Sequence, residues 1–273
     1  MEDVFGRFRL TGRTAIVTGG AGLLGTEFSK TLAAAGASIA VLDIDGDTAE
    51  AVAAEIRRLG GKAQAVTADV TSKESLERAV ALTQENLGSV DILVNSAAKD
   101  PKFDPGHRQA ASNAFEDFPL HVWEEAVRVN LTGAFLTTQA VVPGMLERGG
   151  GTVINICSTY GLVGPDQSIY QSEGQPARFK PVYYSVTKAG ILGFTRYLAA
   201  YYAGKGIRVN ALTPGGVFQD HDPEFVARYS ARTLLGRMAK ASEMNAALLF
   251  LASDASSYMT GSNLVVDGGW TAW

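Results

Sequence analysis

Cysteine is nearly absent from this sequence, because Cys157 is the only one among 273 residues. A single thiol cannot form a disulfide within the chain, which excludes a disulfide-stabilised scaffold and makes a reducing compartment plausible. Histidine is also scarce. His107, His121 and His221 are scattered and lack a metal-ligand spacing such as H-E-x-x-H, so the sequence argues against a metal site.

Strong charge of one sign and long apolar runs are missing too. The 24 basic and 28 acidic side chains give a formal net charge of −4, without a basic run or stripe, so nucleic acid is not an expected partner. No apolar stretch is long enough to cross a bilayer, and the first ten residues lack the apolar core of a signal peptide. We therefore expect a cytoplasmic protein that binds neither nucleic acid nor a membrane.

What is present is a regular alternation of short β-rich runs with longer helical patterns. This alternation is typical of βαβ units and a parallel sheet. The strands are predicted at Thr14–Thr18, Ser38–Asp43, Ala63–Ala68, Ile92–Asn95, Thr152–Ile156, Arg208–Leu212 and Leu264–Val266. No repeat or linker-like break interrupts the pattern. We therefore predict an α/β fold in which residues 1–273 form one domain with a doubly wound, Rossmann-like parallel sheet of about seven strands.

Several helix ends can be predicted from local sequence. Thr71–Glu74 reads as a capping box that opens a helix running toward Leu87. The pair Asp222–Pro223 places a capping side chain before a first-turn proline, which indicates another helix start. The long pattern Trp123–Leu146 contains Pro143, and we expect that helix to bend or end near the proline.

Two stretches resist assignment to helix or strand. Lys99–Pro119 and Leu162–Pro181 have little periodicity and many polar residues. Loops of that length in a compact domain are usually functional or disordered. Both follow the carboxyl ends of predicted strands, where open α/β sheets bind their ligands, so we expect the substrate mouth there.

A glycine-rich loop follows the first predicted strand. Gly20–Gly25 satisfies G-x-G-x-x-G and lies between a strand and an amphipathic helix. This context favours a dinucleotide-binding loop, because glycines permit the tight turn and the close approach of backbone to pyrophosphate. The helix N-terminus then faces the anion with its free N–H groups.

The second predicted strand ends at Asp43, and Ile44 follows it. A carboxylate at this place can accept hydrogen bonds from the ribose hydroxyls, and it repels the 2′-phosphate of NADP. The alternative is that Asp43 only caps the strand and begins a turn. With no arginine or lysine beside it, the strand end favours NAD as the cofactor.

Tyr184 and Lys188 are four residues apart, so in a helix the two side chains share a face. A neighbouring cation favours the phenolate and would bring a tyrosine toward the working range of an acid/base. Tyr183 has Thr187 at the corresponding spacing and is the weaker candidate. Ser158, at the end of the fifth predicted strand, supports an alcohol–carbonyl chemistry. The alternative is an amphipathic helix with a buried tyrosine.

Together these residues resemble the classical short-chain dehydrogenase/reductase family over nearly the whole chain. Thr18–Gly25 is similar to the family's cofactor loop, and Ser158, Tyr184 and Lys188 match its serine, tyrosine and lysine. The resemblance implies that Tyr184 is the acid/base and that Lys188 binds the nicotinamide ribose and lowers the phenol pKa. It also implies that Ser158 bonds the substrate oxygen and that Asn130 holds a relay water. The cofactor-binding positions that it implies are Gly19, Gly22, Leu23, Leu24, Asp43, Asp69, Val70, Asn95, Ala97, Tyr184, Lys188, Pro214, Gly215 and Val217.

The sequence departs from the family pattern in places. Gly22 followed by Leu23 is closer to the cofactor loop of the extended branch that handles nucleotide sugars. Ser158 and Tyr184 are 26 residues apart, about a dozen more than is usual, so the segment between them looks like an inserted lid. This inserted segment weakly resembles family members found in bacterial surface-sugar synthesis.

We expect a small, polar, sugar-like substrate, because the predicted mouth is rich in polar side chains. The candidates are Lys99, Asp100, His107, Tyr160, Gln167, Tyr170, Gln171, Glu173, Arg178 and His221. The leading hypothesis is an NAD-dependent oxidoreductase that interconverts an alcohol and a carbonyl. A sugar epimerase or dehydratase that retains NAD and a non-catalytic NAD-binding regulator remain as alternatives. The resemblance also implies a homo-oligomer, a tetramer or dimer, through the helices around Trp123–Leu146 and Val182–Tyr202.

Overall fold

The chain folds around one sheet of seven parallel strands, seen in a computed structural model that describes residues 3–100, 113–172, 174 and 177–273. The strands are arranged in the order β3-β2-β1-β4-β5-β6-β7. Their bounds are β1 Thr14–Thr18, β2 Ser38–Asp43, β3 Lys62–Thr67, β4 Val90–Asn95, β5 Gly151–Ile156, β6 Ile207–Pro214 and β7 Asn263–Val266. The direction of winding reverses between β1 and β4, which creates a crevice at the carboxyl edge of the sheet. The predicted fold class is confirmed.

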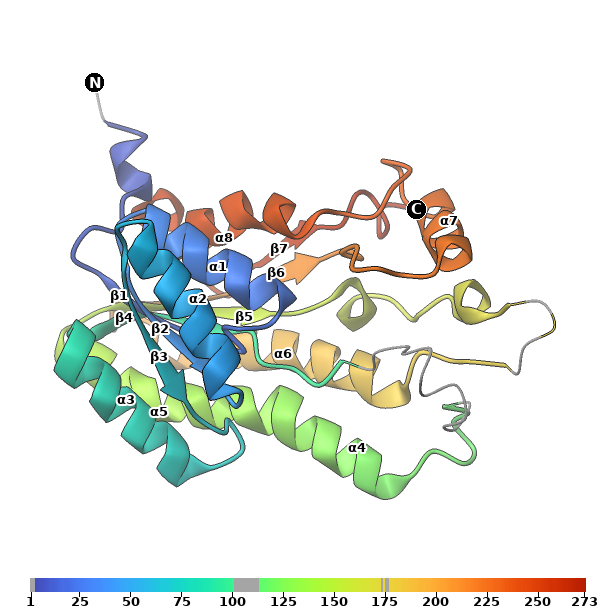
Figure 1. Ribbon diagram of the computed structural model, residues 1–273, viewed down its shortest axis with the longest axis horizontal. Helices are drawn as coiled ribbons and strands as arrows, with labels where there is room; N and C mark the ends of the chain where they lie inside the picture. The colour runs from blue at the N-terminus through green and yellow to red at the C-terminus, as the bar shows by residue number, and fades with distance from the viewer. Residues whose placement is uncertain (1–2, 101–112, 173, 175–176) are drawn as a thin grey trace.

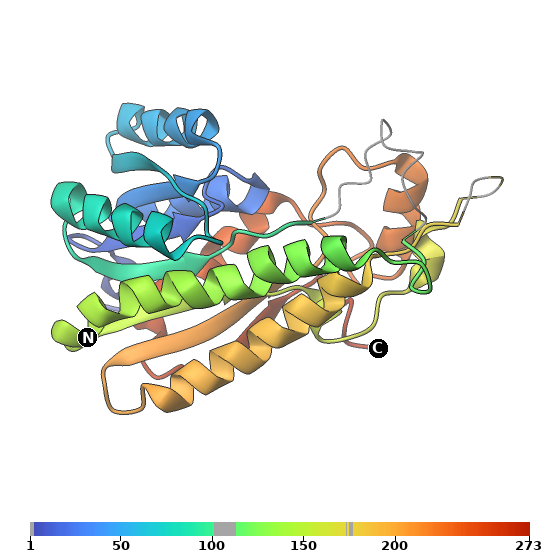
Figure 2. The ribbon, with the colours of Figure 1, turned by 90° about the horizontal axis from the view of Figure 1, so that it is seen from below.

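Helices cover both faces of this sheet (Figure 1). One face carries α1 (Leu23–Ala34), α2 (Gly46–Arg58) and α8 (Asn245–Ala252), which bury Phe28, Val52 and Leu248 with one side of the strands. The opposite face carries α3 (Lys73–Leu87), α5 (Gly133–Glu147) and α6 (Val182–Tyr201), which bury Leu76, Met145 and Leu198. Figure 2 shows α5 and α6 running along this second face. Burial on both faces explains why the central strands are almost wholly apolar.

Most strand ends lie within a residue or two of their predicted positions. β1 and β2 match the prediction residue for residue, whereas β6 continues to Pro214, two residues beyond the predicted Leu212. The predicted cap at Asp222 is present: its carboxylate accepts from the N–H groups of Glu224 and Phe225 and opens α7 (Pro223–Ala231). The predicted capping box at Thr71 is wrong. Ser72 caps α3 instead, because its hydroxyl accepts from the N–H of Ser75.

The helical run does not end at Pro143. Pro143 lies inside α5, which runs on to Glu147. The irregularity of this long helical run comes earlier, where a single π-turn, Arg128–Thr132 (η3), joins α4 (Leu120–Val127) to α5. Proline removes only one N–H donor, and near the end of a helix the remaining turns hold. The π-turn carries Asn130, which is 4% exposed.

Short 3-10 turns complete the described chain at Gly6–Phe8, Thr159–Gly161, Gln167–Tyr170, Ala241–Met244 and Asp254–Ser256. The segment after β5, the start of α6 and α7 extend beyond the carboxyl ends of the strands (Figure 1). Within the described residues, no helix is both long enough and apolar enough to cross a membrane.

Candidate active site

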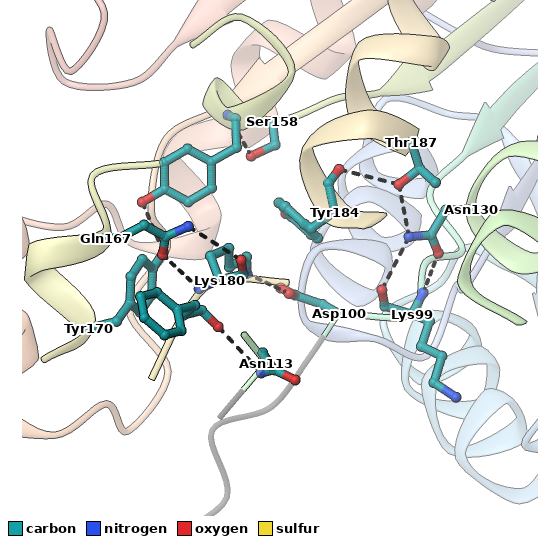
Figure 3. Close-up of polar contacts among 12 residues, drawn as sticks. Lys99, Asp100, Asn113, Asn130, Ser158, Gln167, Tyr170, Lys180, Tyr184 and Thr187 are labelled. Atoms are coloured by element: carbon teal, nitrogen blue, oxygen red, sulfur yellow. Dashed lines mark hydrogen bonds and ion pairs between the residues drawn. The ribbon is translucent and has the colours of Figure 1, made fainter. Parts of the chain in front are cut away.

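The four side chains predicted to act in catalysis all lie at the carboxyl edge of the sheet. Ser158 follows β5 by two residues, Tyr184 lies in the first turn of α6, and Lys188 lies one turn further on. Asn130 comes from the π-turn in the neighbouring helix. Figure 3 shows Ser158, Tyr184 and Asn130 around one space, together with residues of the segment before α6. The fold therefore gathers residues from three parts of the chain.

Two lysines face the ring of Tyr184. The Nζ atom of Lys188 lies 5.9 Å from the ring centroid and donates to the carbonyl of Ile156 at 2.9 Å. The Nζ atom of Lys180 lies closer, 3.8 Å from the centroid, and forms an ion pair of 2.8 Å with Asp100. The sequence predicted the first lysine and missed the second.

Burial is the main influence on the titration of this pair. It raises the pKa of the Tyr184 hydroxyl, and the negative charge of Asp100 raises it further, whereas a hydrogen bond with Ser158 lowers it. Burial also lowers the pKa of the Lys188 ammonium. An acid/base at neutral pH would need the tyrosine pKa brought down, so the charges around the ring matter for the chemistry.

Asn130 joins three elements. Its Oδ1 accepts from the N–H of Lys99 at 2.6 Å, while its Nδ2 donates to the Lys99 carbonyl at 3.2 Å and to the Thr187 hydroxyl at 3.3 Å (Figure 3). The hydroxyl of Thr187 in turn donates to the carbonyl of Tyr184. The amide therefore connects the segment after β4 with the first turn of α6.

The glycine loop packs too closely for side chains at two places. Gly19 has φ +60°, and a Cβ there would lie 2.8 Å from the Cα of Ala97. A Cβ on Gly25 would lie 1.9 Å from the carbonyl oxygen of Gly19. Gly22 begins α1 without a side-chain cap from any described residue, and Leu23 and Leu24 form its first turn. This cradle with an open helix N-terminus fits the pyrophosphate of a dinucleotide.

Asp43 lies beside this loop at the end of β2. Its carboxylate accepts from the N–H of Ala21 at 3.1 Å and from the N–H of Asp45 at 3.2 Å. Ile44 next to it is 72% exposed, so an apolar side chain flanks the carboxylate on the solvent side. The position fits a ribose with free hydroxyls.

The remaining predicted cofactor positions lie along the same edge. Asp69 accepts from the N–H and hydroxyl of Thr71, and Val70 packs against Gly133. The amide of Asn95 donates to Thr138 and Asn155, while the N–H of Ala97 donates to Thr18. Pro214 ends β6, Gly215 donates to Val266, and Val217 pairs with Ala239.

The segment between Ser158 and Tyr184 is attached to its surroundings by side-chain bonds. The Gln167 amide bonds both backbone groups of Lys180, and the Gln171 amide bonds both backbone groups of Arg178. The hydroxyl of Tyr170 donates to that of Tyr160 at 2.9 Å. Within the described residues, this segment therefore forms an ordered wall of the site.

Aromatic rings form the far side of this wall, and the sequence pointed to Tyr160, Tyr170 and His221 but not to Phe225, Tyr229 and Trp270. Tyr229 stacks on Trp270 at 4.3 Å, and Tyr160 meets the edges of both Trp270 and Tyr184. Phe225 of α7 contacts Tyr170 at 5.5 Å and stacks on His221 at 5.3 Å. Only the spacing of Phe225 and Tyr229, one turn apart, could have suggested such a cluster.

Some residues that the sequence singled out do not place a described side chain in the site. The ammonium of Lys99 points away from the site to pair with Glu125, and His107 and Glu173 lie outside the described residues. Cys157 is buried, its thiol contacts the Lys188 carbonyl at 3.2 Å, and burial raises its pKa, so it is an inert core thiol. Among the described residues, no three acidic, histidine or cysteine side chains gather into a metal-binding cluster.

The chain is similar to known oxidoreductases over almost its full length. Residues 20–271 match a family model described as enoyl-(acyl carrier protein) reductase. D-threitol dehydrogenase from Mycolicibacterium smegmatis is 35% identical over 269 residues, 97% of this chain and 95% of that protein. Galactitol 2-dehydrogenase (L-tagatose-forming) from Cereibacter sphaeroides is 34% identical over 272 residues, 97% of this chain and 98% of that protein. The crystal structure of a gluconate 5-dehydrogenase from Burkholderia cenocepacia with NADP and tartrate matches with a TM-score of 0.85 and 32% identity, covering 98% of each chain.

Proposed function

Because the chain belongs to the short-chain dehydrogenase/reductase family and is an oxidoreductase, we propose that it interconverts an alcohol and a carbonyl on a sugar-like substrate with NAD. The observation that carries this proposal is the meeting of Ser158, Tyr184 and Lys188 at the carboxyl edge of the sheet. We propose further that residues 1–273 act as one catalytic domain.

In the oxidation direction, Tyr184 takes the proton from the substrate hydroxyl. Ser158 donates a hydrogen bond to the same substrate oxygen, and Lys188 favours the phenolate form of the tyrosine. Bound nicotinamide would supply the acceptor for the hydride of that carbon. Asn130 holds the backbone beside the tyrosine and a relay water through which the proton leaves. In reduction the proton moves from Tyr184 to the carbonyl oxygen.

Asp43 supports NAD over NADP. Its carboxylate would repel a 2′-phosphate, and exposed Ile44 beside it supplies no cation to accept one. Pyrophosphate would lie on the N-terminus of α1 against Gly19 and Gly22, where no side chain of the described residues caps the helix. Asp69, Val70, Asn95 and Ala97 would line the adenosine side.

A polyhydroxylated substrate fits the polar lining of the mouth. Asp100, Lys180 and His221 lie near one another there: the first two form an ion pair, and both influence the pKa of the third. D-threitol and galactitol, the substrates in the names of two relatives, are short polyols. Such compounds present the alternating donors and acceptors that these side chains can satisfy.

A homo-oligomer in the cytoplasm completes the proposal. The two helices expected at the interface expose Phe135 on α5 and Val186, Tyr197 and Tyr201 on α6, each at least 46% exposed. Large apolar side chains grouped on neighbouring helices favour burial against a second copy. Size-exclusion chromatography with light scattering would give a dimer or tetramer mass, and a monomer at micromolar concentration would refute this part.

The test of function is NADH formation from NAD at mildly alkaline pH across D-threitol, galactitol, gluconate and simple alcohols. We expect turnover on a polyhydroxylated member and none with Tyr184→Phe. Turnover confined to simple alcohols would contradict the substrate class. A protein that purifies with NAD and gives no net NADH would favour the epimerase or dehydratase, which the Gly22–Leu23 pattern suggests. NAD binding without any chemistry would favour a regulator.

A further inference from the structure

Among the described residues, the cation nearest to the ring of Tyr184 is Lys180. Its Nζ atom lies 3.8 Å from the ring centroid, compared with 5.9 Å for Lys188. The side chain of Lys180 is 9% exposed, so little water screens its charge. A cation over the face of an aromatic ring favours negative charge on that ring and its hydroxyl.

Asp100 opposes this cation. Its Oδ1 lies 2.8 Å from the Nζ of Lys180, and its side chain is 56% exposed. Its negative charge raises the pKa of Tyr184. Figure 3 shows the pair reaching toward each other beside the tyrosine, one from the segment after β4 and the other from the residue before Pro181. The ring therefore lies next to two charges of opposite sign that are 80 residues apart in the sequence.

The backbone of Lys180 is fixed without help from Asp100. The Oε1 of Gln167 accepts from its N–H at 2.9 Å, and the Nε2 of Gln167 donates to its carbonyl. Pro181 follows at the N-cap position of α6, where its carbonyl accepts from the N–H of Tyr184. The backbone from which Lys180 reaches the ring would therefore stay in place if Asp100 lost its charge.

Within the part of the chain that the structure describes, the other titratable groups that influence Tyr184 are neutral near neutral pH or are already assigned. Burial raises the pKa of both the Cys157 thiol and the Tyr160 hydroxyl, so neither is charged near neutral pH. Lys188, on the same helix, is the cation of the family pattern. His221 faces Asp100 and Lys180 from the segment after β6, and burial lowers its pKa, which keeps it uncharged at mildly alkaline pH.

We propose that Lys180 and Asp100 are an opposed pair of charges that sets how readily the Tyr184 hydroxyl loses its proton. Lys180 favours the phenolate and Asp100 favours the phenol. Both are positioning residues, since they act through the tyrosine. The proposal rests on the acid/base role of Tyr184 given above, and it adds a second cation that the spacing of Tyr184 and Lys188 does not supply.

Two single substitutions test this proposal, because they should shift the pH midpoint of Tyr184 ionisation in opposite directions. Lys180→Met should raise the pH midpoint of Tyr184 ionisation, and Asp100→Asn should lower it, each by about one pH unit or more. Both substitutions break the same ion pair. A purely structural role would therefore shift the two midpoints in the same direction, whereas an electrostatic role separates them. The double variant should return toward the wild-type midpoint.

The midpoint is measured on the NAD-bound protein from phenolate absorbance, with the Tyr184→Phe form of each variant subtracted to isolate one tyrosine. The pH dependence of NADH formation on D-threitol gives a second reading. Lys205→Met is the matched control, because its Nζ lies 5.1 Å from the ring centroid of Tyr201, away from the site. This control should leave both midpoints unchanged.

Shifts in the same direction, or no shift in either variant, would overturn the proposal. Full activity in Tyr184→Phe would instead remove the acid/base role itself, so the two failures are distinguishable. Cofactor dissociation constants, read from NADH fluorescence, should stay within about twofold of wild type in both single variants. A larger loss together with same-direction shifts would assign the pair to structure alone.

Discussion

Asn130 bonds both backbone groups of Lys99 through its one side-chain amide, accepting at 2.6 Å and donating at 3.2 Å. A residue from a π-turn thus fixes the chain just before Asp100 and at the same time contacts α6 through Thr187. Because the amide is buried, its removal would leave these backbone groups without a side-chain partner. Asn130 therefore connects two segments of the site, and it is also a candidate for the proton relay.

Asn130→Ala should therefore lose both stability and activity. We expect the free energy of unfolding to fall by about 1–3 kcal/mol, since the Lys99 backbone loses buried partners. NADH formation should drop about tenfold or more. Urea unfolding and initial rates would measure the two effects. Asn86→Ala, which removes an exposed amide bonded within α3, is the control and should change stability by less than about 0.5 kcal/mol.

A paired change at the end of β2 should alter the choice of cofactor. Replacing Asp43 with serine removes the repulsion of a 2′-phosphate, and Ile44→Arg supplies a cation for it. The ratio of kcat/KM for NADP over NAD should rise at least about tenfold, which corresponds to about 1.4 kcal/mol. Steady-state kinetics with both cofactors would decide, and an unchanged ratio would show that Asp43 does not face the ribose.

The side chains of Gln167 and Gln171 should protect the segment between Ser158 and Tyr184 from proteolysis. In Gln167→Leu combined with Gln171→Leu, the stretch from Arg178 to Lys180 loses four side-chain-to-backbone bonds. Cleavage within residues 162–181 by a dilute protease should accelerate about tenfold. Gln84→Leu, an exposed change on α3, serves as the control. Equal cleavage rates would mean that the aromatic contacts alone hold the wall.

The exposed ion pair between Arg237 and Glu243 should make the stability of the fold depend on pH in the acid range. Arg237 makes two hydrogen bonds to Glu243, which together with the Lys240 N–H lower the pKa of this carboxyl from 4.5 to about 2. A depressed pKa contributes stability above the ordinary value, and this stability is lost as the pH falls through the folded value. Wild type should thus have a higher urea midpoint than Glu243→Gln near pH 6, and the two should converge near pH 2.

The control for that experiment is Glu85→Gln, an exposed glutamate on α3 that corrects for the lost negative charge. Its difference from wild type should vary little between the two pH values. A difference for Glu243→Gln that is constant with pH would contradict the assignment, because it would show that the side chain contributes by packing rather than by its charge.

The fold was readable from the sequence where burial alone decides structure. Thr14–Thr18 and Ser38–Asp43 are covered by helices on both faces, so their apolar runs end where the strands end. The helical run around Asn130 was not readable, because side-chain periodicity does not distinguish a π-turn from an α-turn. Pro143 is the more visible signal, yet it leaves α5 continuous.

At the site, too, some residues could be predicted from the sequence and others could not. Tyr184 and Lys188 could be paired because helical spacing alone places them on one face. Lys180 is also four residues from Tyr184, but Pro181 separates it from the helix. Its place over the ring depends on Gln167 and on the path of the whole inserted segment. Contacts of that kind depend on tertiary structure, and no local pattern predicts them.

The π-turn at Arg128–Thr132 has a consequence for how this protein can evolve. Loss of one codon there would convert the run from α4 into α5 to a regular α-helix, which costs the helix nothing in backbone bonding. Because a π-turn fits one extra residue into about the same rotation, the helices on either side would keep their buried faces, and only the side chains of the turn itself would change direction. A lineage that suffered this deletion would keep its sheet and its core and would separate Asn130 from Lys99. Mutational scans of the helix would therefore find deletions tolerated for expression and selected against only when turnover is required.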